Sequence, residues 1–516
     1  MNEPAPPFRS RAVGLAGICL WLVAGIFLFA HTVDRDLNHD EHQFIVPGAL
    51  LAGEGALPYR DYPLFHLPNL VFAYAALDRL IGDPILAPKL LSFAGSWLAV
   101  GAILWAAFRT IRAPTAHLIV IGASLLVLFL FDPLVLYTAG KTWNHEVPAC
   151  LLILSILFHV ESARCNSLPL IAMSGAACGL AVGCRLTFAP CLLPLVALTL
   201  FFPGEMRRRW RMAALFTGAA TLALAPSLYF LATSPQPFVF GNLEFPRLRL
   251  LDPDNSRIRK TMTPWRKMRY FIKEIVRPSW PVFLVLVTAL VATFRSSSRS
   301  RHPGLRVIGW TALALLFGCF LPSRYQYQHY FAVIPVALLA IAFAWRRDGD
   351  SAAGRRLVML VAAAAAGSVG LAIHASRESG ASILPAASRL IHRDTWFSSR
   401  AAAFGQEIRA QVPAGRVLTL APAWPVAGKI AVYPEFATGP FAWRSARFVA
   451  SERRAGLHLV APDDLEAFLA AKPPAAILTG VEDDELEKPL IAYAQAHGFR
   501  EVPLGRRREL WLAPAR

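Results

Sequence analysis

Two adjacent carboxylates, Asp40 and Glu41, stand between two imidazoles, His39 and His42, about ten residues after the first hydrophobic segment of the chain. A carboxylate held close to hydrocarbon is costly unless the protein uses it, and it is well placed to act as a general base. The imidazoles would then bind a polar substrate beside that base. The plainer alternative is a polar loop that solvates a helix end. The residue types alone leave both readings open.

The elements that must position these residues are membrane helices. Hydrophobic residues make up 55% of the 516-residue chain, and its mean hydropathy is +0.44, above the usual soluble composition. Apolar windows near the ~20 residues that a spanning helix needs recur through the first three quarters of the chain. The sequence predicts an α-helical polytopic membrane protein of about 11 transmembrane helices, near residues 12–30, 86–108, 115–137, 146–161, 168–184, 188–203, 212–232, 279–294, 305–321, 329–345 and 356–374.

The distribution of cations predicts the orientation of these helices. With the N-terminus inside, most short cytoplasmic loops carry arginines, as the positive-inside rule expects. Asp40 and the tail after residue 375 then lie outside. Residues 247–277 depart from the rule, because this predicted outer loop holds ten Lys or Arg against three acids. A basic stretch with interleaved aromatics suits a membrane surface rich in anionic lipid. The alternative is a miscounted span that would place this loop inside.

The tail has a different composition. Residues 416–420, 475–479 and 509–512 read as short buried strands, and 463–469 and 485–497 read as helices. We therefore predict two domains, a membrane domain over 1–374 and a small α/β extracytoplasmic domain over 375–516. The aromatic and proline-rich string 433–441 is expected to pack in the core of the tail or against the membrane half, and a substrate role is the alternative.

The net charge of +18 is weak support for nucleic-acid binding, because the cations lie mostly at membrane edges and no recognition motif is present. The seven cysteines form no CxxC or CxxH pattern and read as small apolar residues. The histidines are too scattered to predict a metal cluster.

Three predicted outer loops carry polar and aromatic residues pressed against a span. Each loop alone is more often a solvated helix end than a site. Together they predict one extracytoplasmic pocket with a base, cations and stacking surfaces. The candidate substrate-binding residues are Tyr59, Arg60, Asp61 and His66 in the first loop, Lys141, Asn144, His145 and Glu146 in the second, and Arg324, Tyr325, His329 and Tyr330 in the third.

At these loops the chain resembles a known family. The Asp40-Glu41 pair, the string PYRDYPLFHLP (58–68) and the string RYQYQHYFAVIP (324–335) are similar to motifs of GT-C superfamily integral-membrane glycosyltransferases. The branch that it resembles most includes the bacterial protein O-mannosyltransferases and aminoarabinose transferases. The resemblance covers nearly the whole membrane portion, and an extracytoplasmic α/β tail also fits this class.

The resemblance implies a reaction and a role for several residues. In such enzymes a first-loop acid activates the acceptor hydroxyl, which attacks a sugar carried on polyprenyl phosphate with inversion. Asp40 matches this acid best, and Glu41 is the competing assignment. His66 and Pro68 match a His/Pro element of the first loop. Glu146 falls where many members carry a second-loop acid, but the preceding Asn144 and His145 leave its role open.

The same resemblance implies the partners and the location. Arg324 and Tyr325 fall where cationic and aromatic residues would face the lipid phosphate. The partners would be a polyprenyl-phosphate sugar, membrane lipids and a lipid, glycan or protein acceptor, at the inner membrane of a bacterium with the tail in the periplasm. No cofactor is required by the residues, and a divalent cation is left open.

Two rival classes fit the same helices. A lipid-linked sugar flippase or transporter would show internal hydropathy repeats and ionisable residues at mid-membrane depth. No repeat is evident, and Arg185 is the one strongly placed intramembrane cation. A non-catalytic envelope assembly protein would need none of the loop chemistry. A cluster of ionisable residues around Asp40 at one face would favour transfer over transport.

Overall fold

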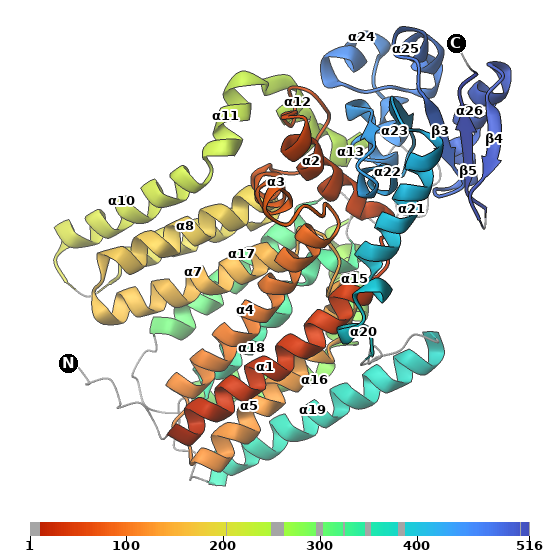
Figure 1. Cartoon of the computed structure of the whole chain (residues 1–516). Coiled ribbons are helices and arrows are strands. Elements are labelled where there is room, and N and C mark those ends of the chain that lie inside the picture. Colours follow the sequence, from red (N-terminus) through yellow and green to blue (C-terminus); the bar gives the residue numbers. More distant parts are fainter. Residues whose placement is uncertain are drawn as a thin grey trace.

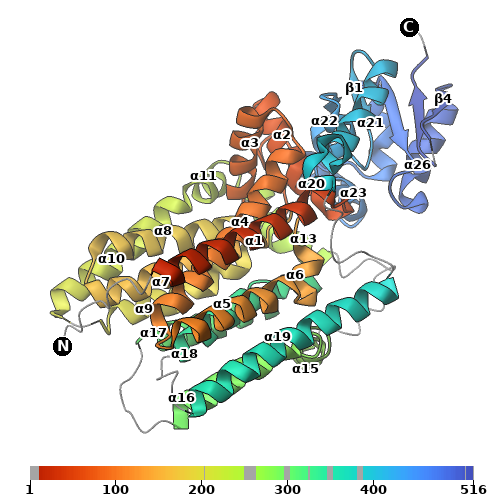
Figure 2. The ribbon, with the colours of Figure 1, turned by 60° about the horizontal axis from the view of Figure 1, so that its bottom comes forward.

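The computed structural model describes residues 11–202, 204–248, 263–295, 303–322, 326–345, 352–379, 388–505 and 507–514. This part of the chain forms a bundle of long helices with a small sheet-containing domain, the tail, at one end (Figure 1). The long helices run side by side in both views, and α19 lies along α5 and α16 (Figure 2).

Five helical segments of the described chain are long and apolar enough to cross a membrane. They are α1 (Arg11–Asp34), α4 (Leu86–Thr110), α7 (Glu146–Cys165), the segment Tyr327–Ala344 that ends in α18 (Val333–Ala344), and α19 (Ala352–Ser379). Shorter apolar helices accompany them: α5 (Thr115–Leu130), α8 (Leu168–Cys184), the 3₁₀ turn η2 (Leu186–Cys191) with α9 (Leu192–Thr199), and α17 (Pro303–Phe320).

Two bent helix pairs raise the number of candidate spans to seven when each pair counts as one. The first joins α10 (Met206–Ala223) to α11 (Ala225–Thr233) at 58°, where Pro226 stands in the first turn of α11. The second joins α15 (Pro264–Tyr270) and the π-helical turn η5 (Phe271–Val276) to α16 (Trp280–Arg295) at 99°. A proline removes a helix donor, and a π-turn distorts the ladder, so both are usual causes of a bend.

Each of the eleven segments predicted from the sequence coincides with one of these apolar helices or pairs. The prediction of a polytopic helical membrane fold is confirmed, whereas the number of true spans stays a prediction. One boundary was wrong. The predicted span 115–137 is divided at Asp132, whose carboxylate accepts a hydrogen bond from the backbone N–H of Leu134 at 2.9 Å and so begins the short helix α6 (Pro133–Thr138).

The first outer loop contains regular helices. The 3₁₀ turn η1 (His39–Glu41) leads into α2 (His42–Gly53), and α3 (Asn69–Ile81) follows. Both helices lie between the bundle and the tail (Figure 1). The α12–α13 region (Pro235–Val239, then the π-helical turn η3 at Phe240–Glu244, then α13 at Phe245–Leu248) lies beside them.

The tail contains a five-stranded sheet in the order β2-β1-β3-β5-β4. Strand β1 pairs in parallel with β2 and β3, while β5 pairs antiparallel with β3 and β4. The strands predicted near 416, 475 and 509 are present, and two more complete the sheet. The strands are β1 (Arg416–Leu418), β2 (Ala431–Val432), β3 (Ala476–Thr479), β4 (Arg500–Pro503) and β5 (Glu509–Leu512).

Helices and 3₁₀ turns surround this sheet. They are α20 (Ser388–Ile391), η7 (Arg393–Thr395), α21 (Phe397–Gln411), α22 (Ala423–Ala427), η8 (Pro434–Phe436), α23 (Pro440–Ala446), α24 (Ser451–Arg454), η9 (Ala455–Leu457), η10 (Pro462–Asp464), α25 (Leu465–Ala471) and α26 (Asp484–Ala496). The helices predicted near 463 and 485 correspond to α25 and α26.

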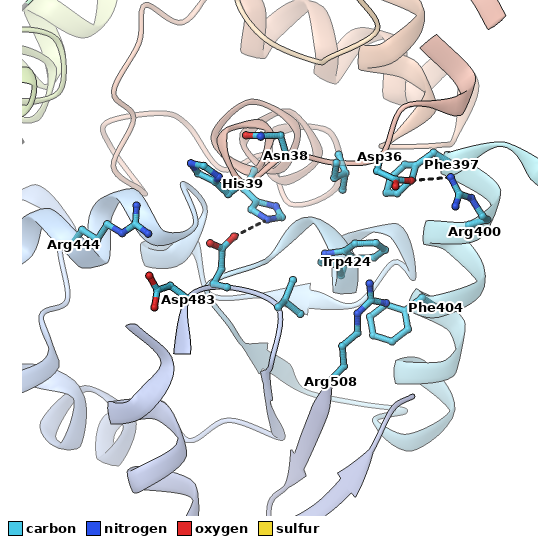
Figure 3. A pocket seen from close by; sticks show the side chains of 14 residues that line it. Asp36, Asn38, His39, Phe397, Arg400, Phe404, Trp424, Arg444, Asp483 and Arg508 are labelled. Atoms are coloured by element: carbon cyan, nitrogen blue, oxygen red, sulfur yellow. Dashed lines mark hydrogen bonds and ion pairs between the residues drawn. The ribbon is translucent and has the colours of Figure 1, made fainter. Parts of the chain in front are cut away.

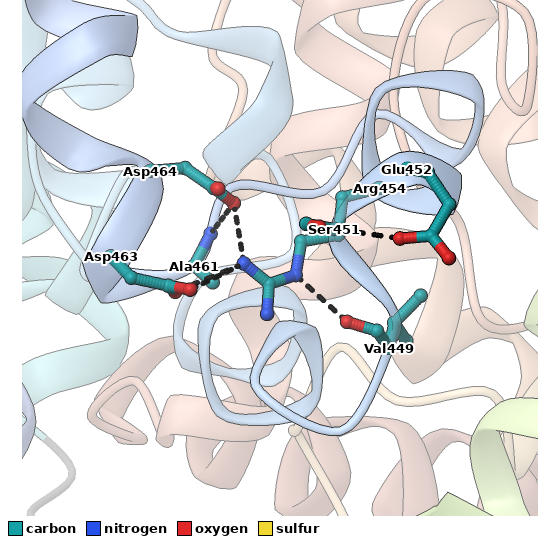
Figure 4. A network of polar contacts seen from close by, with 7 residues as sticks. All are labelled: Val449, Ser451, Glu452, Arg454, Ala461, Asp463 and Asp464. Carbon is teal, nitrogen blue, oxygen red and sulfur yellow. Dashed lines mark hydrogen bonds and ion pairs between the residues drawn. The ribbon is translucent and has the colours of Figure 1, made fainter.

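Arg454 is the polar centre of one side of the tail (Figure 4). Its buried guanidinium donates to the carbonyl of Val449 and to the carboxylates of Asp463 and Asp464, at 2.8 to 3.0 Å. Asp464 in turn accepts from the backbone of Ala461 at 3.1 Å. Hydrogen bonding from Arg454 lowers the pKa of the Asp463 carboxyl. Because Nε and Nη1 of this buried guanidinium have carbonyl and carboxylate acceptors, Arg454 joins the segments around 449 and 461–464.

The tail packs on the first loop through two apolar clusters. One joins Tyr62 of the loop to Phe397 and Ala423 of the tail, and the other joins Phe65 to Phe441. The string 433–441 serves both uses expected for it, since Phe436 lies in the core of the tail while Phe441 reaches the membrane half.

Candidate functional site

Glu41 is held entirely by hydrogen bonds inside the protein. Its side chain is buried, and one carboxylate oxygen accepts from the backbone N–H of Asn38 at 2.6 Å. The other oxygen accepts from the backbone N–H and the hydroxyl of Thr142, at 2.6 and 2.8 Å. Glu41 therefore completes the capping box of η1 and fastens the first outer loop to the second.

Asp40 is more open than its neighbour. Its side chain is 17% exposed, and its carboxylate lies 3.4 Å from Nε2 of His39. The Asp40 charge also acts on Lys141 and Tyr137 of the second loop region. An acid that is partly exposed, beside cations, keeps a free oxygen for a substrate proton, which Glu41 does not.

The second loop reaches Asp40 and Glu41 because of a close backbone approach at Gly140. This residue has φ +79°, and a Cβ there would lie 2.6 Å from Cα of Thr32 in α1. Only glycine fits such a left-handed, crowded position without strain. Gly140 thus allows Lys141 and Thr142 to pack beside the end of α1.

Lys141 is a buried ammonium without a hydrogen-bond acceptor among the described residues. Its Nζ lies over the rings of Tyr137 and Trp143, 3.8 and 4.0 Å from their centroids. Burial lowers the pKa of Lys141 to about 8; Arg35 also lowers it, while Glu41, Asp40 and Glu146 oppose the shift. Its three N–H donors are available to a negatively charged ligand.

Arg35 and Lys89 brace the same corner and were not among the predicted site residues. Arg35 donates to the carbonyls of Leu136 and Tyr137 at 2.9 and 2.7 Å, at the end of α6. Lys89, fully buried in α4, donates to the carbonyls of Arg35 and Gly140 at 2.8 and 3.1 Å. Lys89 could have been noticed, because a lysine inside an apolar segment is rarely there without a function.

Glu146 faces this corner from the first turn of α7. Its side chain is fully buried, and neither carboxylate oxygen has a hydrogen-bond partner among the described residues. Glu41, Lys141 and Arg35 are its charged neighbours. An unsatisfied buried carboxyl group is costly, which is typical of a group that meets a ligand.

A second chain of polar contacts begins beside this corner. His66 contacts the side chains of Gln43 at 3.1 Å and Asn144 at 3.3 Å. Arg185 donates to Oδ1 of Asn144 at 2.6 Å and to Nδ1 of His145 at 3.0 Å. Burial, followed by the Arg185 charge, keeps the pKa of His145 well below its usual value, so this imidazole is neutral and accepts.

Several other predicted site residues lie elsewhere. Tyr59 is buried in the core, where its hydroxyl donates to the carbonyl of His66 and accepts from Asn242. Arg60 and Asp61 pair with each other at 2.8 Å near the surface. Hydrogen bonding from Arg60 lowers the pKa of Asp61. These three positions belong to the packing of the first loop.

The remaining candidate residues lie either at the contact between the first loop and the tail or in the third loop. His42 is buried with Nε2 3.5 Å from Glu482 of the tail, and His39 stacks on Phe441. The ring of His329 lies 6.3 Å from that of His145. Tyr330 is buried against Phe271 and Phe320. Arg324 and Tyr325 lie outside the described residues.

The basic stretch lies at the same end of the bundle as Asp40. Lys267 of α15 donates to the carbonyls of Phe320 and Pro322, at 2.6 and 2.8 Å. The third loop that it caps contacts the second, because the rings of Tyr327 and Tyr137 are 5.3 Å apart. These contacts place residues 263–277 at the same end of the bundle as the second and third loops, and their outer placement stays a prediction. Residues 249–262 lie outside the described part.

Among the described residues, no group of three or more His, Cys, Asp or Glu side chains is placed to hold a metal ion. The seven cysteines are free thiols.

Comparisons with known proteins give structural relatives alone. No family model matches the chain, and no curated protein matches it. Two solved structures of ArnT from Cupriavidus metallidurans have TM-scores of 0.62. The form bound to undecaprenyl phosphate is 14% identical and covers 98% of this chain and 99% of its own. The apo form is 15% identical and covers 98% and 100%.

The apo oligosaccharyltransferase of Archaeoglobus fulgidus is also similar, with a TM-score of 0.50, 11% identity, and coverage of 90% of this chain and 70% of that one. This chain therefore has a fold like that of ArnT, with a small C-terminal sheet domain, as the resemblance noted from its sequence predicted.

Proposed function

We propose that this protein is a membrane glycosyltransferase that moves a sugar from polyprenyl phosphate to a hydroxyl group of an acceptor, with inversion. The fold shared with ArnT, which was solved with bound undecaprenyl phosphate, supports a polyprenyl-linked donor. The observation that carries the proposal is the contrast at Asp40, an open carboxylate beside a fully satisfied one and beside a buried lysine with unused donors.

In this proposal Asp40 is the general base. It accepts the proton of the acceptor hydroxyl as that oxygen bonds to the anomeric carbon, and the bond from this carbon to the phosphate oxygen breaks. The leaving polyprenyl phosphate gains negative charge, which a nearby cation stabilises. Lys141 supplies that charge, because its ammonium is buried near Asp40 and has no other acceptor among the described residues.

Other residues bind and orient the substrates. The unsatisfied carboxyl group of Glu146 is suited to hydrogen bonding with sugar hydroxyls, and His66 and Asn144 extend this polar wall. Arg35 and Lys89 keep the two loops together. We also propose that Arg324 and Tyr325 contact the donor phosphate, as the family resemblance implies.

The proposed setting is a bacterial inner membrane, with Asp40 and the tail on the periplasmic side. The clustering of ionisable residues at one end of the bundle supports transfer chemistry over a transport pathway at mid-membrane depth. The acceptor would be a lipid, a glycan or a protein.

The test is transfer of label from radioactive undecaprenyl-phosphate sugars to bacterial envelope fractions by the purified full chain. Asp40→Asn keeps size and polarity but cannot accept the proton, so transfer should fall by about 10²-fold or more. Asp394→Asn, at an exposed carboxylate of the tail, should transfer at the wild-type rate. Near-normal transfer by Asp40→Asn would show that Asp40 is not the base. If the wild-type chain transfers label from none of the donors, the proposal that the protein is a glycosyltransferase is wrong.

A further inference from the structure

A pocket of about 780 Å³ lies between the first loop and the tail. One wall is the segment from Asp36 to His42, and the other comes from α21, α22, α23 and the loops that carry Glu482 and Arg508 (Figure 3). Its volume is in the range of pockets that hold small molecules. The proposed reaction does not by itself account for this space.

Most charged side chains of the lining already have partners. Asp36 pairs with Arg400 at 2.8 Å, and Glu482 lies 3.5 Å from Nε2 of His42. Asp483 accepts at Oδ1 from the backbone N–H of Glu485, which caps α26. The acids of the pocket are therefore engaged on its walls.

Two arginines of the lining are not engaged in this way. Among the described residues, no hydrogen bond or ion pair involves the guanidinium of Arg444 or that of Arg508. They stand on different sides of the pocket (Figure 3). Burial lowers the pKa of Arg508, and Glu407 opposes this only at longer range.

The setting of Arg508 fixes its orientation and leaves its donors free. Its guanidinium lies over the rings of Phe404 and Trp424, 4.3 and 4.5 Å from their centroids. The two rings are nearly perpendicular to each other, at 88°, so cation–π contact with both holds the guanidinium in one place without using its N–H groups as hydrogen-bond donors to the protein. A partly desolvated arginine with unused N–H groups is suited to binding an oxyanion in a forked geometry.

The pocket is also beside the proposed base. His39 forms part of its lining, and Nε2 of His39 is 3.4 Å from the Asp40 carboxylate. A molecule that fills the pocket is therefore separated from Asp40 by the side chain of His39.

We propose that this pocket binds the acceptor substrate through an oxyanion, a phosphate or a carboxylate on a saccharide, held by Arg508, while Arg444 on the other side of the pocket contacts the saccharide. This inference rests on the proposed transfer reaction and deepens it, because it makes the acceptor an anionic sugar-bearing molecule and gives the tail a part in choosing it.

The test measures binding, separately from transfer. The full chain in lipid nanodiscs is titrated with glucose 6-phosphate, glucuronate and neutral glucose, followed by ligand-observed NMR. We expect the two anionic sugars to bind and glucose to bind at least about tenfold more weakly, as for the loss of a charge-assisted hydrogen bond. The tighter of the two anions identifies phosphate or carboxylate as the preferred group.

Variants locate the site. Arg508→Gln and Arg444→Gln should each weaken binding of the preferred anion about tenfold or more, and Arg508→Lys, which keeps the charge and loses the fork, should fall between. Arg500→Gln, an exposed arginine on β4, is the matched control and should bind as the wild type does. Equal binding of glucose and the anions, or wild-type affinity in Arg508→Gln with a normal unfolding temperature, would overturn the proposal.

Asp40→Asn separates this proposal from the transfer reaction. The variant should bind the anionic sugar as the wild type does while transfer is lost. If Asp40→Asn transfers normally but the arginine variants lose binding, the proposed base is wrong and the pocket stands. If binding survives in both arginine variants, the pocket is wrong whatever the transfer assay shows.

Discussion

The first outer loop meets its two neighbours in different ways. Toward the second loop, Glu41 is wholly buried and each of its contacts is a short hydrogen bond. Toward the tail, Asp36 and Arg400 form an ion pair in which both side chains are about half exposed or more, across the wall of an open pocket. One junction is built to stay closed, and the other leaves room for a ligand. The difference indicates that the contacts which hold Asp40 in place come from the bundle, and in the proposed reaction the tail would contribute selectivity.

The largest expected effect on stability comes from a substitution at the closed junction between Glu41 and the second loop. Glu41→Gln removes the charge that three donors share, so we expect a loss of about 3 kcal/mol of stability, in the range for a buried charged acceptor. Asp40→Asn should change stability by less than about 0.5 kcal/mol, because its side chain makes no comparable contacts. Unfolding in mixed micelles measures both. Equal stability of the two variants would mean that Glu41 does not hold the loops together.

The next prediction sharpens the role of the closed junction in catalysis. With the pKa of Lys141 lowered to about 8, its charge is mostly present at pH 7 and mostly lost at pH 9. Transfer that uses this charge should fall about tenfold across that interval. Lys141→Arg stays charged and should abolish the decline. A pH–rate profile of transfer measures this, and an unchanged decline in Lys141→Arg would assign it to another group.

An effect of similar size concerns the loop of the tail that faces His42. Glu487 is buried in α26 and accepts from the backbone of Gly480 and Glu482, at 2.6 and 3.1 Å. Burial raises its pKa to about 7. The folded tail thus binds this proton more tightly than the unfolded chain does. The stability it contributes is full below about pH 4.5 and is lost as pH rises through 7.

We therefore expect the full chain to lose on the order of 2 kcal/mol between pH 5 and pH 8 from this group. Glu487→Gln should flatten that dependence. Thermal unfolding at several pH values checks it, with Glu485→Gln, at an exposed side chain of the same helix, as the control.

The smallest effect is expected at the open junction. Arg400→Ala removes an exposed ion pair, and such pairs contribute about 0 to 1 kcal/mol. Unfolding should change within that range and should respond to salt. A loss as large as that of Glu41→Gln would erase the contrast between the two junctions.

The sequence was sufficient for the membrane fold because a bilayer demands long apolar helices. The span predicted over 115–137 extended too far, through residues 131–137, because apolar side chains continue past Asp132, which caps α6. The helix α2, a 12-residue apolar helix with Pro47 inside, was also missed, because no polar–apolar period marks it.

Four candidate residues from the sequence, the acids at 40, 41 and 146 and the lysine at 141, lie together in the structure, and their roles stay a prediction. The carboxylate of Glu41, unlike that of Asp40, accepts hydrogen bonds from Thr142. Thr142 is 101 positions away in the sequence, so no local pattern contains that contact. Arg508 and Trp424 meet only once the sheet of the tail has formed.

The lengths of the apolar helices have a consequence for the surrounding lipid. At 1.5 Å per residue, α5 and α8, with 16 and 17 residues, reach about 25 Å, while the hydrocarbon of a typical bilayer is about 30 Å thick. Such a mismatch is relieved by local thinning of the bilayer. Near these helices the plane of lipid phosphates should therefore lie closer to the midplane, and a lipid-linked substrate would have less distance to rise before its head group meets the protein.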